Sequence, residues 1–208
     1  MHRQIGRAKN SLSFSPETGF VLGIARMVGN ERFGLQGVNN VFEDGFGFER
    51  WADYALDVIY SPEGDNILET GGGIHRALPM LGDEPFIVVN GDIFCDFDPS
   101  LLKLSPQDVA CLVMVPNPPH NRAGDFVLRD GRLVDEGGEG LTFSGIAMYS
   151  KSLFDGCEDG VFPLAPLLRS AIARGRVAGL LHTGLWRDVG TPQRLSELDA
   201  WIRERPDG

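Results

Sequence analysis

Positive charge is scarce in this sequence, and lysine is scarcer still. Of its 208 residues, 19 are Lys or Arg and 29 are Asp or Glu, so the formal net charge is −10. The lysines are Lys9, Lys103 and Lys151. Nucleic acids and anionic membranes are bound through basic surfaces, so we expect neither as a partner. A nucleotide is not excluded, because Mg²⁺ and backbone N–H groups can hold it locally.

Cysteine is also rare, and several well-known sequence motifs are missing. Cys95, Cys111 and Cys157 form no C-x-x-C pair, which is typical of reduced thiols in a cytoplasmic protein. The sequence has no apolar run long enough to cross a bilayer and no signal-peptide pattern at its start. It lacks G-x-S-x-G and G-x-x-x-x-G-K-[ST], so hydrolase and P-loop functions have no support. The histidines are too scattered to predict a zinc site.

Strand-like and helix-like segments alternate along most of the chain. This alternation, with hairpins in the second half, predicts a three-layer α/β fold with a mixed β-sheet in a single domain, 1–208. Residues 1–57 are atypical, because they show no clear period, and 20–27 suit either a strand or a helical turn. The predicted strands are 55–60, 86–90, 109–115, 126–128, 132–134, 141–149, 177–182 and 185–189, and the predicted helices begin near 74, 98, 164 and 192.

Turn and cap residues mark several of these boundaries. Each acts through a local hydrogen bond or a backbone angle that other residues adopt less easily. They are the hairpin pair Asp130-Gly131, the helix N-cap Asp98 before Pro99, the helix C-cap Gly175 and the N-cap Thr191 before Pro192.

The stretch 60–92 contains a run of glycines, a short helix and an apolar strand. The glycines at 71–73 predict a tight turn that lets the backbone approach a ligand, with a helix from Ile74 onward. The strand 86–90 is expected to be buried on both faces. It leads to Asp92, at the end of a strand where open α/β sheets bind ligands.

Asp92 and Asp188 each follow an apolar strand. If these strands are neighbours, the two carboxylates converge at one rim and suit Mg²⁺, which keeps waters and bridges to substrate phosphates. The alternative is ordinary turn or cap chemistry. For Asp188 in particular, that alternative is a hydrogen bond to the backbone at the start of the last helix.

Six short motifs follow one another along the chain: YSPEG (60–64), LETGGGI (68–74), VNGD (89–92), GDF (124–126), TFSGI (142–146) and WRDVGT (186–191). In this order they resemble the sugar-1-phosphate nucleotidyltransferases, most closely the group that acts on N-acetylmuramate 1-phosphate in cell-wall recycling. The resemblance covers roughly residues 58–208. It implies a Rossmann-like nucleotidyltransferase fold. It also implies transfer of a uridylyl group from UTP to a sugar 1-phosphate, best N-acetylmuramic acid 1-phosphate, with release of pyrophosphate.

The resemblance also implies roles for individual residues. Asp92 and Asp188 correspond to the catalytic, Mg²⁺-binding aspartates of the family. The residues implied in nucleotide binding are Glu69, Thr70, Gly71 and Gly72, and those implied in sugar binding are Gly124, Asp125, Phe143, Ser144 and Gly145. The alternatives are a flexible connector at the glycines, a turn entering a hairpin at 124–126 and a small residue inside a strand at 143–145.

The N-terminal part departs from the family. Family members begin with a strand and a Gly-rich loop that bears an Arg, ends near Pro-Lys-Pro and wraps the triphosphate. Residues 1–57 do not contain this loop. We therefore expect weak turnover, low stability and an unpaired sheet edge. One alternative function is an inactive remnant that binds sugar phosphate. Another is a UDP-sugar glycosyltransferase that uses Asp96 and Asp98.

Overall fold

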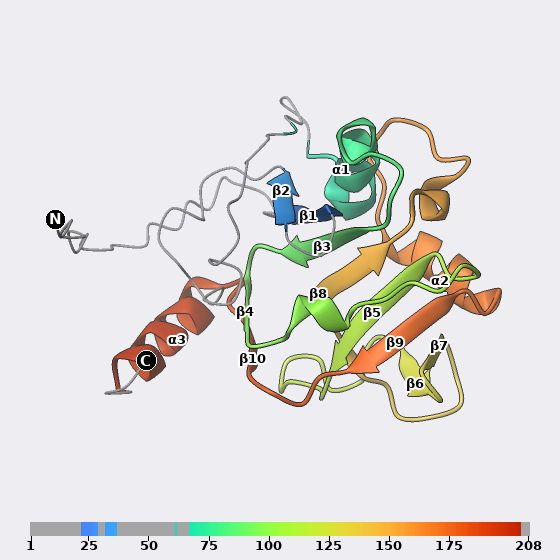
Figure 1. The fold of residues 1–208 in the computed structure, drawn as a ribbon. Helices are drawn as coiled ribbons and strands as arrows, with labels where there is room; N and C mark the ends of the chain where they lie inside the picture. Colours follow the sequence, from blue (N-terminus) through green and yellow to red (C-terminus); the bar gives the residue numbers. More distant parts are fainter. Residues whose placement is uncertain (1–21, 29–31, 37–60, 62–66, 205–208) are drawn as a thin grey trace, which may run out of the picture.

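The computed structural model describes residues 22–28, 32–36, 61 and 67–204, with only the backbone described for the first two ranges. An eight-stranded sheet has the order β2-β1-β3-β8-β5-β9-β7-β6, and β4 and β10 form a separate two-stranded sheet (Figure 1). The strands are β1 (Leu22–Val28), β2 (Arg32–Gln36), β3 (Phe86–Asn90), β4 (Ile93–Cys95), β5 (Ala110–Val115), β6 (Val127–Arg129), β7 (Arg132–Val134), β8 (Thr142–Tyr149), β9 (Val177–Leu181) and β10 (Trp186–Asp188). The helices are α1 (Glu69–Ala77), α2 (Ala165–Ala173) and α3 (Pro192–Arg203), with 3-10 turns at Leu78–Met80, Pro99–Leu101 and Lys151–Phe154.

The large sheet is mixed, as predicted. Strands β5 and β9 run parallel, whereas the other neighbouring pairs run antiparallel. The expected α/β fold with a mixed sheet is confirmed. The predicted strand at 55–60 lies outside the described residues.

Alternate residues of the central strands pack on opposite faces of the sheet. In β3, Phe86 and Val88 face a core covered by α1 and α2, while Ile87 and Val89 face a second core. The second core is closed by β4, by Trp186 of β10 and by the segment 97–104. The sheet is therefore the middle of three layers, and β3 is buried on both faces as expected. Helix α3 lies beside the small sheet (Figure 1).

The local turn and cap signals are confirmed. Asp98 accepts a hydrogen bond from the Ser100 N–H at 3.0 Å, although it caps a 3-10 turn and not the longer helix expected there. Asp130 and Gly131 have φ angles of 50° and 74° in the β6–β7 hairpin. The caps at the ends of the longer helices are Gly175, with a φ of 66°, and Thr191, which accepts from the Arg194 N–H.

The glycines at 71–73 do not form the predicted turn. They lie inside α1, which begins at Glu69. A Cβ on Gly72 would lie 2.1 Å from the Gly160 carbonyl oxygen, and one on Gly71 would lie 2.6 Å from the Phe162 ring. The Gly72 N–H also donates to the Phe162 carbonyl at 3.1 Å. These glycines are needed because the backbone at 160–162 packs directly on the helix, a contact that local sequence does not reveal.

The expectation of an unpaired sheet edge is wrong at β3. The stretch 20–27 suited either a strand or a helical turn. Residues 22–28 form β1 and pair antiparallel with β3, from Leu22 opposite Asn90 to Arg26 opposite Phe86. Strand β2 then pairs with the outer edge of β1. The N-terminal part thus supplies backbone hydrogen bonds that the comparison of motifs alone did not predict.

Candidate functional site

Two strand pairings bring Asp92 and Asp188 together. Asp92 lies in the short turn between β3 and β4, and Asp188 is the last residue of β10. Strands β4 and β10 pair antiparallel, with Asp188 opposite Ile93. The Val189 N–H then donates to the Asp92 carbonyl at 2.8 Å. The strands that carry Asp92 and Asp188 are therefore neighbours. The sequence predicted that the two carboxylates would converge under this condition.

Both carboxylates lie against Gly190. A Cβ on this residue would be 2.6 Å from Asp92 Oδ2 and 3.1 Å from Asp188 Oδ1. The absence of a side chain at Gly190 thus leaves a small space that two carboxylate oxygens border. The Gly190 N–H donates to Asp188 Oδ1 at 2.8 Å, which holds this carboxylate in place. Asp188 therefore makes the backbone hydrogen bond that was expected as its alternative role. It also lies close to the Asp92 carboxylate.

The electrostatics reflect this crowding. Burial raises the pKa of Asp92 above its ordinary value, and the negative charge of Asp188 raises it further. The Asp92 backbone N–H and the Arg194 guanidinium act in the opposite direction. Two carboxylates that share a site disfavour each other's ionised form unless a cation offsets their charge.

The residues fit a hard divalent cation. They offer two carboxylates, and Mg²⁺ commonly takes one or two protein carboxylates together with waters and substrate phosphates. Within the described part of the chain, no three His, Cys, Asp or Glu side chains gather as a complete protein-only metal site. A partial donor set of this kind is suited to a cation that arrives with, or stays bound to, a phosphate.

Asp188 also contacts two basic side chains. Arg194, in the first turn of α3, donates from Nη1 to Asp188 Oδ2 at 3.0 Å. The same Nη1 lies 3.1 Å from His120 Nε2. His120 Nε2 also lies 3.4 Å from Asp188 Oδ2, so the histidine, the arginine and the aspartate meet at one point.

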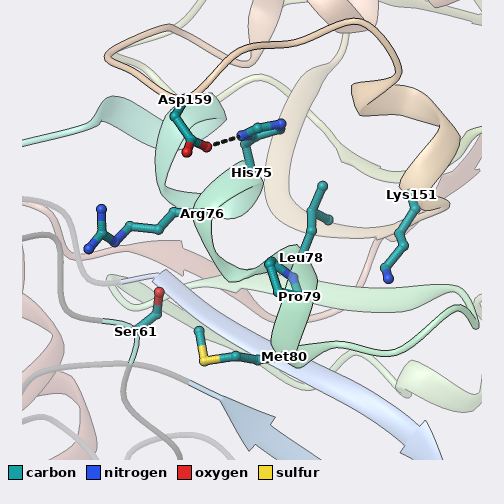
Figure 2. A pocket seen from close by; sticks show the side chains of 8 residues that line it. All are labelled: Ser61, His75, Arg76, Leu78, Pro79, Met80, Lys151 and Asp159. Atoms are coloured by element: carbon teal, nitrogen blue, oxygen red, sulfur yellow. Dashed lines mark ion pairs between the residues drawn. The ribbon is translucent and has the colours of Figure 1, made fainter.

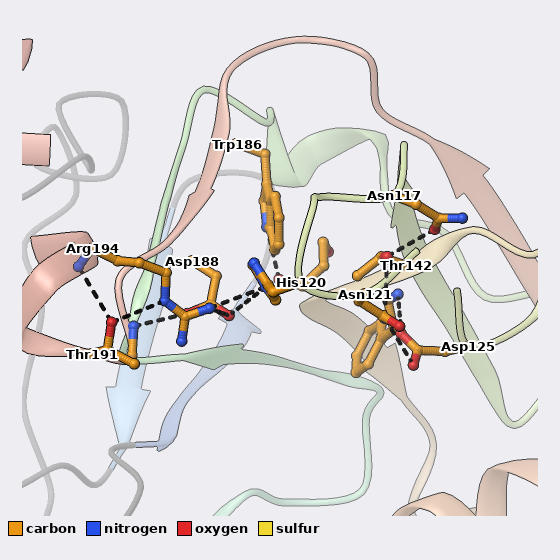
Figure 3. A network of polar contacts seen from close by, with 12 residues as sticks. Asn117, His120, Asn121, Asp125, Thr142, Trp186, Asp188, Thr191 and Arg194 are labelled. Carbon is orange, nitrogen blue, oxygen red and sulfur yellow. Dashed lines mark hydrogen bonds and ion pairs between the residues drawn. The ribbon is translucent and has the colours of Figure 1, made fainter. Parts of the chain in front are cut away.

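A network of side chains fixes the loop that carries His120 (Figure 3). The Thr142 hydroxyl donates to Asn117 Oδ1 at 2.9 Å and accepts from Asn121 Nδ2 at 3.2 Å. Asp125 accepts from Asn121 Nδ2 at 3.2 Å and from the Phe143 N–H at 2.8 Å. These bonds tie the loop between β5 and β6 to the start of β8. They leave His120 directed toward Asp188.

The predicted sugar-binding residues lie along this same region. Gly124 has a φ of 70°, and a Cβ there would lie 2.5 Å from the Gly140 backbone, so the hairpin entry requires glycine. Ser144 is fully buried, and its hydroxyl accepts from the Ile146 N–H at 3.1 Å. Gly145, with a φ of 82°, packs against the Asn90 side chain two residues before Asp92. Ser144 therefore shapes this region from the interior, whereas Asp125 holds the backbone of Phe143 from the surface.

The predicted nucleotide-binding residues are at the start of α1. Glu69 is exposed and adopts a positive φ of 58°, and Thr70 is half-buried. Gly71 and Gly72 are buried under the segment 160–162. Of the four, Glu69 and Thr70 remain open to a ligand. Among the hydrogen bonds of the described residues, none joins these four residues to Asp92 or Asp188.

A pocket of about 620 Å³ lies elsewhere, on the outer side of α1 (Figure 2). The ion pair between His75 and Asp159, 3.1 Å apart, stands at one side of it, and Lys151 stands at another. None of the predicted site residues lines this pocket.

The Asp96–Asp98 pair is not arranged as a metal site. Asp98 caps the turn at Pro99–Leu101, and Asp96 pairs with His182 at 3.0 Å. The glycosyltransferase alternative therefore loses the residues on which it depends.

His120 and Arg194 were missed by sequence reasoning. His120 stands in a loop whose residue composition is typical of exposed loops. Arg194 resembles a solvated residue on the surface of a helix. Only the position of Arg194, three residues after the cap Thr191 and six after Asp188, could have suggested that its side chain reaches back.

Comparison with known proteins finds relatives by sequence, among them two uridylyltransferases. An N-acetylmuramate alpha-1-phosphate uridylyltransferase of Neisseria meningitidis is 49% identical over 156 residues, which are 71% of this chain and 68% of the relative. A protein of the same name from Caulobacter vibrioides is 31% identical over 161 residues, which are 71% of this chain and 66% of the relative. The chain thus spans about two thirds of the length of either relative. No protein-family model matches it.

Solved structures share the fold. A putative glucose-1-phosphate thymidylyltransferase from Bacillus anthracis, in complex with a sucrose, superimposes with a TM-score of 0.56 at 15% identity. The match covers 76% of this chain and 70% of that structure. At this identity the likeness concerns the fold, and it confirms the expected Rossmann-like nucleotidyltransferase architecture.

Proposed function

Because the chain belongs to the family of N-acetylmuramate α-1-phosphate uridylyltransferases, we propose that it transfers a uridylyl group from UTP to a sugar 1-phosphate. A phosphate oxygen of the sugar 1-phosphate attacks the α-phosphorus of UTP in line, and pyrophosphate leaves. Such a reaction depends on positioning and charge stabilisation more than on covalent help from the protein. The sugar 1-phosphate we expect is N-acetylmuramic acid 1-phosphate. This substrate fits a cytoplasmic role in recycling the cell wall.

The observation that carries the proposal is the convergence of Asp92 and Asp188 over Gly190. We assign these two carboxylates as the ligands of Mg²⁺. When bound, the ion offsets the negative charge of the phosphates that surround the reacting phosphorus. The two aspartates would hold the ion, and the Gly190 N–H fixes the orientation of Asp188 Oδ1.

The segments at either side of this pair would bind the two substrates. We assign the nucleotide to Glu69 and Thr70 at the start of α1, with Gly71 and Gly72 maintaining the helix against the segment 160–162. We assign the sugar to the region of Gly124, Asp125 and 143–145. There the hydrogen bonds of the exposed Asp125 and of the buried Ser144 hold the backbone in position.

Three unpaired cysteines are compatible with the reducing cytoplasm. None of the helices in the described part of the chain has the length and apolar character needed to cross a membrane.

The experiment is a pyrophosphate-release assay with a panel of nucleoside triphosphates and sugar 1-phosphates. UTP with N-acetylmuramic acid 1-phosphate should be the best pair. In a form of the chain that is active, Asp92→Ala and Asp188→Ala should each abolish Mg²⁺-dependent release, while Asp155→Ala, at an exposed position, should have no effect. A preference for GTP with mannose 1-phosphate would move the chain to another substrate class. Undiminished rates in both aspartate variants would overturn the site.

A further inference from the structure

Several hydrogen bonds hold the Arg194 side chain in one position at the surface of its helix. Its backbone N–H and its Nε both donate to the Thr191 hydroxyl, at 3.3 and 3.2 Å. Its Nη1 then reaches Asp188 Oδ2 at 3.0 Å (Figure 3). The helix that carries Arg194 is itself fixed on the small sheet by Trp201, whose ring lies 6.3 Å from that of Phe94.

The guanidinium also borders the space above Gly190. Its Nη2 lies 3.5 Å from the position that a Gly190 Cβ would take, next to Asp92 Oδ2 and Asp188 Oδ1. The same small space is therefore lined by two carboxylate oxygens and one guanidinium. In this arrangement the guanidinium acts as the counterion of the pair.

We propose that Arg194 and a divalent cation compete for Asp188, so that metal binding displaces the Arg194 guanidinium and frees it for a substrate phosphate. This inference rests on the proposed function, since it takes Asp188 as a metal ligand. Two cations that approach the same carboxylate repel each other strongly at such distances. A displaced guanidinium is well suited to phosphate, because its planar fork matches pairs of phosphate oxygens.

This competition has a consequence for the order of binding. A free metal ion replaces Arg194 but gives the released guanidinium nothing to bind. A metal–nucleotide complex brings a cation for the carboxylates and an anion for the guanidinium at the same time. Arg194 therefore weakens the binding of free metal and favours metal that arrives with phosphate. In this role Arg194 is a positioning residue before the substrate enters and a phosphate ligand afterwards.

The test is a calorimetric titration of the full chain with Mn²⁺ alone, at fixed pH and low salt, without nucleotide. Arg194→Gln should bind Mn²⁺ more tightly than the parent, by roughly fivefold, since it removes one charge-assisted contact to Asp188. Arg194→Lys, which keeps the charge but loses the Nε bond to Thr191, should fall between the two. The matched control is Arg203→Gln in the last turn of α3, where the exposed Arg203 pairs with the partly exposed Asp199. It removes the same charge from the same helix and should leave the affinity within about twofold of the parent.

A second measurement guards against misfolding. In EDTA, Arg194→Gln should unfold at a lower temperature than the parent, and Mn²⁺ should close that gap. Asp188→Asn separates the two possible failures. If it binds Mn²⁺ as the parent does, the metal assignment is wrong and the inference falls with it. If Asp188→Asn loses affinity but Arg194→Gln binds Mn²⁺ no more tightly than the parent, the competition alone is overturned.

Discussion

Asp92 Oδ2 and Asp188 Oδ1 face one another across Gly190, 2.6 and 3.1 Å from the place where a Cβ would stand. Asp92 leaves the large sheet through β3, whereas Asp188 ends a strand of the small sheet. Two acidic side chains from different sheets are thus held together by the pairing of β4 with β10. Several measurable consequences depend on this contact.

Gly190→Ala should impair metal binding while leaving the fold intact. The added Cβ meets the far ends of two side chains and not backbone, so Asp92 and Asp188 can swing aside. Displaced ligand orientation typically lowers metal affinity roughly 10- to 100-fold. Titration with Mn²⁺ and a thermal melt measure the two effects. Gln193→Ala, at an exposed position nearby, is the control. Unchanged affinity would mean that the space above Gly190 is not the metal site.

Asp92→Asn should stabilise the metal-free protein. Burial and Asp188 raise the pKa of Asp92, so folding disfavours its ionised form. At neutral pH, removal of the charge should raise the free energy of unfolding by roughly 0.5–2 kcal/mol. The gain should disappear at acid pH, where the native side chain is itself protonated. Urea denaturation in EDTA tests this, and a loss of stability at neutral pH would contradict it.

Gly72→Ala should destabilise the fold although alanine is the better helix former. The helix propensity favours alanine by about 1 kcal/mol. The added Cβ would nevertheless lie 2.1 Å from the Gly160 carbonyl, and overpacking of this kind costs roughly 1–3 kcal/mol or more. Arg76→Ala, on the exposed side of the same helix, should change stability by less than about 0.5 kcal/mol. If Gly72→Ala unfolds like the parent and loses only nucleotide affinity, the glycine serves the ligand and not the packing.

Asp125→Ala should lower stability as well as the use of the sugar substrate. It removes the acceptor of the Phe143 N–H and of Asn121, and the loss of a hydrogen bond of this kind costs roughly 0.5–1.5 kcal/mol. Asp135→Ala breaks an ion pair with Arg169 at the surface and should cost less than about 1 kcal/mol. Chemical denaturation beside KM measurements distinguishes the roles. A raised KM for the sugar with unchanged stability would indicate direct contact with the substrate.

The chain as it stands should be a weak enzyme. Loss of a single preorganised donor to developing charge typically costs about 3–4 kcal/mol of transition-state stabilisation, and residues 1–57 lack a whole triphosphate loop of the family type. A family-like N-terminal segment joined ahead of Val58 should raise pyrophosphate release, measured side by side with the ungrafted chain. Robust turnover without the graft would mean that residues 1–57 bind the triphosphate in another way.

The sequence predicted those features whose causes are local. Asp98, the pair Asp130-Gly131 and Thr191 act on groups within a few residues of themselves, so their chemistry can be read without a fold. Strand β3 was equally clear, because both of its faces are apolar. The division of the chain into domains remains a prediction.

Features that depend on distant segments were misread or missed. The glycines of α1 were interpreted as a ligand-binding turn because the segment 160–162, which packs on them, is far away in sequence. His120 meets Asp188 through tertiary structure, whereas Arg194 lies six residues after it on the following helix. Their proximity is a property of tertiary structure, and a single sequence contains no signal that links the loop of His120 to α3.

The small sheet also separates the assembly of the site from that of the main fold. Every strand of the eight-stranded sheet precedes β10 in the chain. During synthesis the large sheet can form before Asp188 arrives, so the nascent domain is not exposed to the repulsion between the two aspartates. The ladder that finally joins them has three residue pairs, from Trp186 with Cys95 to Asp188 with Ile93. So short a ladder can open and close by local unfolding while the large sheet stays intact.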